Sequence, residues 1–326
     1  MPQKRTSATS LLTKDAVLAA YARIRSAVVE TPVEEVSNLF SPMAGDVFFK
    51  MENLQETGSF KLRGASNKIL GLSKSQAGRG VIAASNGNHG LGVAAAAKRA
   101  GISAEVFVSE QVSPAKAQRI QQLGATVRRV GIDPLEAELA ARSAAERSGK
   151  VFISPYNDLD VMAGQGTVAV ELLHQLGEAN AVFVAVGGGG LIGGIGAYMK
   201  AASPQTDVVG CWPQNSPVLY ESIKAGRILH VPEQRTVSES TAGGLEQDSV
   251  TLDVCRRVID RSVLVSEDEI LSSMRLVRDK KGWLIEGAAA VAIAAFLKQA
   301  GRYRGKKVAI IICGGNVSEK VRARIE

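Results

Sequence analysis

Short β-branched apolar runs alternate with alanine-rich amphipathic stretches along this chain of 326 residues, and no other feature constrains its fold as strongly. The apolar runs predict strands and the alanine-rich stretches predict helices, a pattern typical of βαβ units around a mostly parallel sheet. The predicted strands span residues 47–50, 80–84, 104–108, 126–130, 181–186, 208–211 and 307–313. The predicted helices span residues 90–100, 114–123, 134–148, 164–176, 191–202, 270–280 and 283–300, with a capping box of Ser266 and Glu269 before the helix at 270–280. The sequence therefore predicts an α/β fold, and its length suggests about two domains.

The composition indicates a globular enzyme and argues against other classes. Hydrophobic residues make up 45% and charged residues 22%, and no run approaches the roughly 18 apolar residues of a membrane span. The net charge is +7, but the basic residues are scattered and aromatic residues are only 5%, so we expect no nucleic-acid partner. Three cysteines without metal-type spacing indicate a reducing cytoplasm. Lys4 and Arg5 precede no apolar stretch of signal-peptide length, so we expect no secretion, and we expect the basic stretch through residue 10 to be a loose tail.

One lysine lies in a setting suited to holding an aldehyde cofactor. In residues 58–65 (GSFKLRGA), Arg63 is a cationic neighbour that could favour the neutral, nucleophilic amine of Lys61. The flanking glycines leave room for a bulky ring, and Phe60 can lie against a planar π system. Pyridoxal phosphate fits this setting. The alternative is that Lys61 only opens a solvated helix.

A glycine-rich turn, Gly187, Gly188, Gly189 and Gly190 followed by Leu191, lies between a predicted strand and a predicted helix. Residues without side chains let backbone N–H groups converge on an anion, and the helix N-terminus adds a favourable dipole, so the turn predicts a phosphate site. Gly188, Gly190 and Gly193 also fit the G-x-G-x-x-G fingerprint of dinucleotide-binding oxidoreductases, which need an acid at the end of the next strand. Asp207 has about the right spacing but precedes that strand, so pyridoxal phosphate is favoured over NAD. A purely structural turn is the remaining alternative.

Two further polar segments follow predicted strands. The first contains Ser85, Asn86, Gly87, Asn88 and His89, and it opens a helix, so it predicts a second anion site; the alternative is an ordinary polar turn in which His89 caps the helix or packs.

The second polar segment is 313–316 (CGGN), which delivers the side chain of Cys313 into a glycine-rich opening. The alternative for Cys313 is a buried thiol that acts as a small hydrophobe.

Segment 53–65 resembles the cofactor-lysine motif of the threonine/serine dehydratase family, and the motifs at 85–90, 187–191 and 313–316 follow in the matching order. This family consists of fold-type-II pyridoxal-phosphate enzymes, which are tryptophan synthase β-like and have two open, mostly parallel α/β domains. The resemblance implies a large cofactor-binding domain of residues 1–52 and 156–326 and a small, mobile substrate domain of residues 53–155. It also implies a homodimer. Because the chain ends soon after Cys313, we expect no C-terminal regulatory domain.

The resemblance assigns roles to particular residues. Lys61 would form the Schiff base and move the Cα proton, while segment 85–89 would grip the substrate carboxylate and Asn88 the phenolic oxygen of the cofactor. Cys313 stands where relatives carry Ser or Thr bonded to the pyridine nitrogen, Asn157 would contact the ring, and Glu286 would lie near the pyridine, although Glu286 fits a buried structural carboxylate equally well. The implied cofactor contacts are Phe60, Lys61, Asn88, Asn157, Gly187, Gly188, Gly189, Gly190, Leu191, Glu286 and Cys313, and the implied substrate contacts are Ser85, Asn86, Gly87, Asn88 and His89.

The resemblance implies β-elimination of a 3-hydroxy amino acid to a 2-oxo acid and ammonia. The alternatives are an amino-acid racemase on the same fold, an NAD-dependent oxidoreductase and a non-catalytic binding protein. Mammalian-type serine racemases use a serine as a second base where Asn86 stands, and an amide cannot exchange that proton. Residues 211–216 (CWPQNS) lack the acids that bind Mg²⁺ in metal-dependent members, so we expect no metal site.

The departures from the commonest members at Asn86, at Gly243 and at residues 211–216 point to a substrate other than plain serine or threonine. Gly243 stands where many relatives place an aspartate near the substrate. Together with 215–217 (NSP), 240–244 (STAGG) and 313–316 (CGGN), this resembles the hydroxyectoine-utilisation dehydratases, whose substrate would be a 3-hydroxy amino acid from ring-opened hydroxyectoine.

Overall fold

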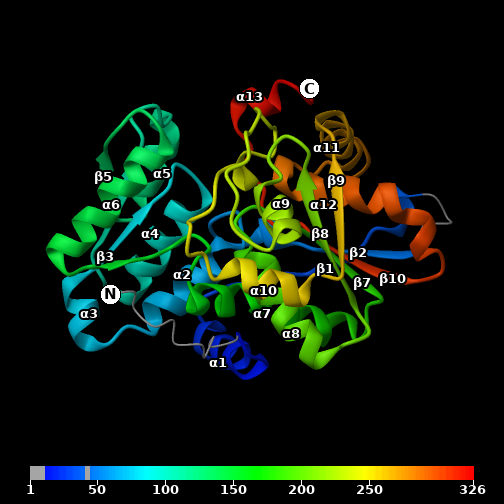
Figure 1. Cartoon of the computed structure of the whole chain (residues 1–326), viewed down its shortest axis with the longest axis horizontal. Helices are drawn as coiled ribbons and strands as arrows, with labels where there is room; N and C mark the ends of the chain where they lie inside the picture. The colour runs from blue at the N-terminus through cyan, green and yellow to red at the C-terminus, as the bar shows by residue number, and fades with distance from the viewer. Residues whose placement is uncertain (1–11, 41–44) are drawn as a thin grey trace.

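The computed structural model describes residues 12–40 and 45–326. It has two α/β parts of different size side by side, each built around its own sheet (Figure 1). The predicted loose tail through residue 10 lies outside the described residues. The larger sheet has the strand order β1-β2-β10-β7-β8-β9, and the smaller one has the order β5-β4-β3-β6. Every pairing is parallel except that of β1 with β2. The predicted α/β class with mostly parallel sheets is confirmed.

The larger sheet draws its strands from both ends of the chain. Its strands are β1 (Val33–Glu35), β2 (Asp46–Lys50), β7 (Ala181–Ala185), β8 (Asp207–Pro213), β9 (Arg261–Val265) and β10 (Lys307–Ile311). All five residues of β7 are buried, as expected for a central strand whose two faces are both covered by helices. The smaller sheet contains β3 (Val81–Ala84), β4 (Ala104–Val108), β5 (Thr126–Arg129) and β6 (Val151–Phe152).

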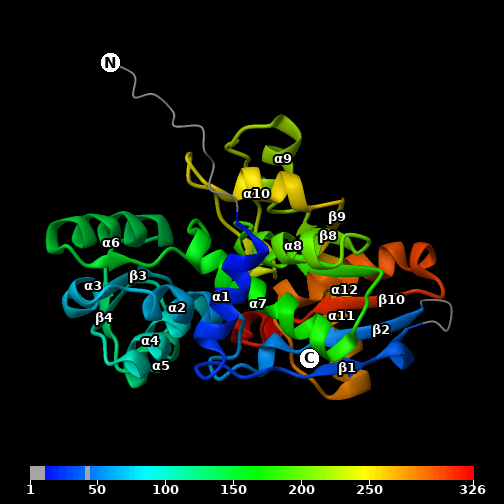
Figure 2. The same ribbon diagram turned by 90° about the horizontal axis from the view of Figure 1, so that it is seen from below.

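Helices cover both sheets, and three of them meet at the centre of the molecule (Figure 2). The central three are α2 (Lys61–Leu70), α7 (Leu159–Leu176) and α8 (Gly190–Ala202). The others are α1 (Lys14–Ile24), α3 (Lys74–Arg79), α4 (Asn88–Ala100), α5 (Pro114–Gln122), α6 (Pro134–Ser148), α9 (Val218–Ala225), α10 (Thr251–Val258), α11 (Glu267–Lys281), α12 (Gly287–Gln299) and α13 (Glu319–Arg322). Glycines in α7 allow the close packing, because a Cβ on Gly164 would lie 2.7 Å from Gly64 Cα and one on Gly166 would lie 2.7 Å from Gly194 O.

The predicted strands are all present, with ends within two residues of the expected ones. The predicted capping box is confirmed, since Ser266 and Glu269 exchange both hydrogen bonds at the start of α11. Three helix starts were wrong, and one of them is that of α11, which begins at Glu267 directly after its cap and not at residue 270. Helix α7 begins earlier than predicted because Asp158 caps it by accepting from two backbone N–H groups, and α12 begins only after Glu286, whose extended backbone ends the preceding segment.

None of the helices in residues 12–40 and 45–326 combines the length and the apolar character needed to cross a lipid bilayer.

Candidate active site

The candidate site lies at the carboxyl ends of three parallel strands, which is the usual position of ligands in open α/β sheets. Strand β3 leads into segment 85–89, β7 leads into the glycine turn at 187–190, and β10 leads into Cys313. Helix α2, which begins with Lys61, lies between the two sheets (Figure 1). The motifs that are scattered along the sequence are therefore gathered around one helix end.

Lys61 is the first residue of α2, and its side chain is partly buried. Its Nζ donates a hydrogen bond to the carbonyl oxygen of Pro155 at 2.8 Å and lies 5.2 Å from the centre of the Phe60 ring. Burial lowers the pKa of Lys61 from 10.5 to about 8, although the neighbouring Cys313 and Glu286 act in the opposite direction. The neutral amine that a carbonyl requires is thus accessible near physiological pH.

Arg63 does not activate Lys61 as the sequence suggested. Residues two apart on a helix face different sides, and the guanidinium of Arg63 pairs with Glu52 at 2.7 Å and with Glu171 at 2.6 Å, away from the amine. Its charge is therefore neutralised, and the lowered pKa of Lys61 has burial as its main cause.

The lysine loop is joined to the Cys313 segment by an antiparallel bridge between Ser59 and Gly314. The N–H of Phe60 donates to the carbonyl of Cys313 at 3.1 Å, and the N–H of Gly315 donates to the carbonyl of Gly58 at 2.9 Å. Gly58 has a φ of +76°, where a Cβ would also lie 2.8 Å from the Asn316 side chain, so only glycine fits this turn. The bridge holds Cys313 beside the lysine loop.

Cys313, Glu286 and Asn88 form a buried cluster next to Lys61. The Cys313 thiol donates to Glu286 Oε1 at 3.8 Å, and Asn88 Nδ2 donates to Glu286 Oε2 at 2.8 Å. Burial raises the pKa of Glu286 and raises that of Cys313 well above its ordinary value. The thiol hydrogen is therefore bonded to Glu286. The same carboxyl group thus connects Cys313, the predicted contact of the pyridine nitrogen, with Asn88, the predicted contact of the phenolic oxygen.

Asn316 and Ser240 belong to the same cluster and were not assigned a role from the sequence. Asn316 Nδ2 donates to Asn88 Oδ1 at 2.7 Å and to the Thr57 carbonyl at 2.9 Å. Ser240 Oγ accepts from Asn88 Nδ2 at 3.4 Å. The place of Asn316 in the glycine-rich 313–316 motif was the only signal for it, and nothing in the sequence places Ser240 beside residue 88.

The glycine turn begins α8 and is closely covered. Gly189 has a φ of +88°, and Leu191 is buried in the first turn of the helix. A Cβ on Gly187 would lie 2.9 Å from the Thr241 backbone, and one on Gly188 would lie 2.4 Å from the ring of Tyr156. Side chains are thus excluded along the turn, and its backbone N–H groups stay close to any bound anion.

Segment 85–89 leads into the start of α4, and Gly87 within it faces open space. No atom would lie within 4 Å of a Cβ on Gly87, whose N–H donates to Ser85 Oγ at 3.1 Å. Asn86 is bound in both directions to Ser109 at the end of β4, since its Nδ2 donates to Ser109 Oγ at 2.8 Å and its Oδ1 accepts from the Ser109 N–H at 2.9 Å. His89 is buried, with Nε2 2.8 Å from the carbonyl of Ile153 and a pKa lowered by burial to about 3.

Asn157 has both polar atoms engaged by a neighbouring segment. Its Nδ2 donates to Glu246 Oε2 at 2.9 Å, and its Oδ1 accepts from the Val250 N–H at 2.9 Å. Tyr156 joins the same segment, because its hydroxyl accepts from the Glu246 N–H at 3.0 Å. A ring contact by Asn157 stays a prediction, and the sequence gave no indication of the Glu246 partner.

The residues present fit pyridoxal phosphate. Two helix N-termini, at Asn88 and Gly190, suit two anionic groups such as a phosphate and a carboxylate. Ser59 Oγ and His89 Nδ1 are buried without a hydrogen-bond partner among the described residues, as expected of groups beside a ligand. The turn at 187–190 and Lys61 would hold the two ends of the cofactor.

The geometry does not favour a dinucleotide. Asp207 begins β8, at the edge opposite the glycine turn, and it is paired with Arg261 at 3.0 Å. It is therefore not available to hold a ribose at the glycine turn.

In residues 12–40 and 45–326, no group of three or more His, Cys, Asp or Glu side chains is arranged to hold a metal ion.

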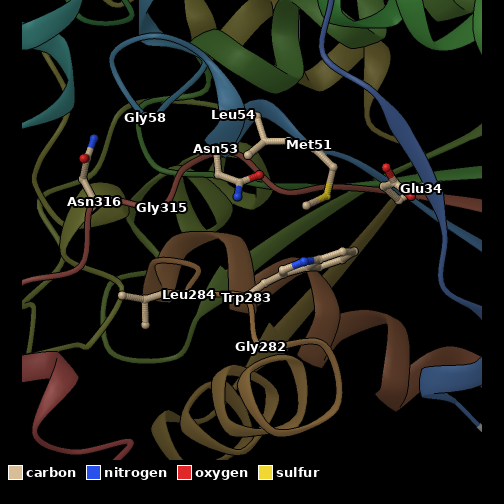
Figure 3. A pocket seen from close by; sticks show the side chains of 10 residues that line it. All are labelled: Glu34, Met51, Asn53, Leu54, Gly58, Gly282, Trp283, Leu284, Gly315 and Asn316. Atoms are coloured by element: carbon tan, nitrogen blue, oxygen red, sulfur yellow. The ribbon is translucent and has the colours of Figure 1, made fainter.

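A cavity of about 580 Å³ lies beside the lysine loop (Figure 3). Met51, Trp283 and Leu284 give it apolar walls, and Asn53 and Asn316 add polar groups. Lys61 does not line it, but Asn316, which donates to Asn88 at 2.7 Å, lies in its wall.

A Gly188→Ala substitution tests the close covering of the glycine turn. The added methyl would overlap the Tyr156 ring, and overpacking of this kind costs about 1–3 kcal/mol. We expect a lower melting temperature and a cofactor dissociation constant raised about tenfold, which corresponds to about 1.4 kcal/mol. Gly78→Ala is the control, because a Cβ on Gly78 would have no atom within 4 Å beyond its chain neighbours and its own helix. Equal cofactor affinity in the two variants would contradict the packing described for Gly188.

The pH dependence of cofactor capture tests the lowered pKa of Lys61. With a pKa of about 8, about one tenth of the amines are neutral at pH 7, against about one in three thousand for an ordinary lysine. We expect cofactor-free protein to capture pyridoxal phosphate faster as the pH rises, with a plateau above about pH 8. The measurement is the borohydride-fixed adduct on the Lys61 peptide by mass spectrometry. A rate that keeps rising to pH 10 would mean that burial does not lower this pKa.

Comparisons with known proteins agree with this site. A family model described as "Pyridoxal-phosphate dependent enzyme" matches residues 24–314. L-threonine ammonia-lyase from Thermotoga maritima is 38% identical over 97% of this chain and 78% of its own length, and phenylserine dehydratase from Ralstonia pickettii is 35% identical over 97% of both chains. The structure of maize serine racemase superposes with a TM-score of 0.90 at 30% identity, covering 96% of both chains. The chain therefore belongs to the fold-type-II family of pyridoxal-phosphate-dependent enzymes.

Proposed function

We propose that the protein eliminates water from a 3-hydroxy amino acid and releases a 2-oxo acid and ammonia. The observation that carries this proposal is the position of Lys61, whose amine lies beside Pro155 O and near the cluster of Cys313 and Glu286. Similarity to a threonine ammonia-lyase and a phenylserine dehydratase over nearly the whole chain supports the same reaction class.

Each end of the site has a distinct task in this proposal. The turn at 187–190 and the N-terminus of α8 bind the cofactor phosphate, while segment 85–89 and the N-terminus of α4 bind the substrate carboxylate. Bound pyridoxal phosphate supplies an electron sink that favours loss of the Cα proton and of a leaving group from Cβ. Lys61 would hold the cofactor covalently, and its amine would be the base for the Cα proton.

The surroundings of Asn86 favour elimination over racemisation. Racemisation needs a second group that exchanges protons on the opposite face of Cα, and the amide of Asn86 neither ionises nor turns freely, because Ser109 binds both of its ends. Lys61 then remains the one group assigned to move this proton.

We further propose that the substrate is a 3-hydroxy amino acid derived from ring-opened hydroxyectoine. The sequence at 215–217, 240–244 and 313–316 supports this proposal. The position of segment 240–244 in the wall of the candidate site supports it as well. Ser240 reaches Asn88, and Thr241 covers Gly187, so a change in segment 240–244 alters the wall of the site.

A substrate screen tests both levels of the proposal. Threonine, serine, 3-hydroxyaspartate and 3-hydroxy-2,4-diaminobutyrate derivatives are compared by release of 2-oxo acid and ammonia, with chiral chromatography of the remaining amino acid. We expect elimination without inversion at Cα, and the highest kcat/KM for a diaminobutyrate derivative. A clear preference for serine or threonine would reject the hydroxyectoine substrate but keep the dehydratase. Inversion without ammonia would identify a racemase instead.

We also propose that residues 53–155 move as a small substrate domain against residues 1–52 and 156–326, in a cytoplasmic homodimer. Arg142 lies 2.9 Å from Glu246 and Arg119 donates to Asn316 at 3.1 Å across the boundary between the two parts, and such partly exposed pairs cost little to break. Arg63 also crosses this boundary through buried pairs with Glu52 and Glu171, so α2 would stay anchored to the larger part while the rest of residues 53–155 moves.

A further inference from the structure

Four charged side chains are buried together behind the first turn of α2. Lys50, Glu52 and Arg63 have no exposed surface, and Glu171 is 1% exposed. Their formal charges cancel. Burying two ion pairs has a large desolvation cost, and apolar replacements of similar volume are often as stable, so stability alone is a weak reason for such a cluster.

Arg63 is at the centre of this cluster, and each of its N–H groups has an acceptor. Its Nε and Nη2 donate to the two oxygens of Glu52, both at 2.7 Å. Its Nη1 and Nη2 donate to the two oxygens of Glu171 at 2.6 and 2.7 Å, and Nη1 also reaches Thr167 Oγ1 at 3.2 Å. A guanidinium gripped on both edges cannot rotate or slide without breaking several charge-assisted hydrogen bonds.

The partners of Arg63 come from two different elements of the larger part of the molecule. Glu52 follows β2 and Glu171 lies in α7, whereas Arg63 lies in α2. Lys50 connects the partners, because its Nζ donates to Glu171 Oε2 at 2.7 Å and to the Thr31 carbonyl at 2.6 Å, and Thr31 Oγ1 donates to Glu52 Oε1 at 2.6 Å. The first turn of α2 therefore can neither rotate about the helix axis nor shift along it relative to β2 and α7.

Lys61 lies in that same turn, on the other side of the helix. Rotating α2 about its axis would move Lys61 Nζ away from Pro155 O, to which it is bonded at 2.8 Å. We propose that Arg63, clamped by Glu52 and Glu171, is a positioning residue for Lys61, which sets the direction of the amine that the proposed function requires. This inference rests on the proposed role of Lys61 and adds three residues that touch neither cofactor nor substrate.

The Arg63→Lys variant tests the inference, because it keeps the charge but cannot grip two carboxylates at once. Ile270→Ala is the control: Ile270 is fully buried in α11, so it lowers the melting temperature without touching α2. Two quantities are measured on each protein: the pH midpoint for capture of pyridoxal phosphate by Lys61 in cofactor-free protein, and kcat with KM for the best substrate. We expect Arg63→Lys to shift the midpoint and to lower kcat at least about tenfold with little change in KM, as misplaced catalytic groups do.

The control variant and the unmodified protein distinguish a failure of the inference about Arg63 from a failure of the proposed function. Arg63→Lys with the midpoint and kcat of the unmodified protein would reject the inference, and so would an equal shift in Ile270→Ala, which would mark a general effect of instability. If Arg63→Lys does not fold, Glu52→Gln replaces it, since that variant keeps the shape of the side chain and loses one acceptor of the clamp. Failure of the unmodified protein to capture the cofactor at Lys61 would reject the proposed function itself.

Discussion

The Lys61→Ala variant is expected to lose the covalently held cofactor and at least about 10⁴-fold of the elimination rate. Both losses have one cause, because the same amine is assigned to hold the cofactor and to move the Cα proton. The glycine turn and the helix N-termini are untouched, so the variant should still bind pyridoxal phosphate, but reversibly. Borohydride treatment followed by dialysis and absorbance measurement distinguishes the two forms of binding.

Lys68→Ala is the matched control for this variant. Lys68 lies on the same helix and is partly exposed, and it pairs with Asp158 at 2.8 Å and Asp160 at 2.9 Å. Such pairs contribute at most about 1 kcal/mol, so we expect nearly unchanged activity and an unchanged adduct. A borohydride-fixed chromophore that survives in Lys61→Ala would show that another lysine holds the cofactor.

The Glu286→Gln variant is expected to lower kcat about 100-fold while changing the melting temperature little. Glutamine has the shape of glutamate and can still accept from Asn88, so the packing of the cluster is kept. It cannot ionise or hold a proton beside Cys313, whose thiol now donates to Glu286. Glu286→Ala is expected to lose activity and also about 1–3 kcal/mol of stability, because the buried Asn88 amide and Cys313 thiol are left without their acceptor.

The pair of variants decides between the two interpretations of Glu286 that the sequence left open. A purely structural carboxylate predicts full activity in Glu286→Gln and damage only in Glu286→Ala. A carboxyl group that acts on the cofactor through Cys313 predicts that Glu286→Gln and Cys313→Ala are not additive in a double-mutant cycle measured on kcat.

The sequence indicated the chemistry of the candidate site better than it indicated the hydrogen-bond partners of the residues in it. The positions of Lys61 at the start of α2 and of the glycine turn at the start of α8 could be predicted, because each is a local pattern at a strand or helix end and such patterns have local physical causes. The partners of these residues come from distant segments: Pro155 for Lys61, and Asn316 and Ser240 for Asn88. No periodicity or spacing encodes such pairs.

The error about Arg63 has the same origin. Nearness in sequence suggested an effect on Lys61, whereas helical geometry points the two side chains apart and a buried pair of glutamates decides the orientation of Arg63. Some elements were also missed: β1 has three residues and β6 has two, too few to display a period, but β9 with five residues and α1 with eleven were not predicted either.

The position of β10 has a consequence for how the protein is made. This strand pairs with β2 on one side and β7 on the other, so a segment that is synthesised long after both neighbours is inserted between them in the larger sheet. The bridge from Gly314 to Ser59 also waits for that segment. A nascent chain can form the smaller sheet early, but it cannot assemble the lysine loop against Cys313 until residues 307–314 have been synthesised. A chain truncated before residue 307 would therefore lack Cys313 and would leave β2 and β7 each without a neighbouring strand, which exposes them to aggregation and proteolysis.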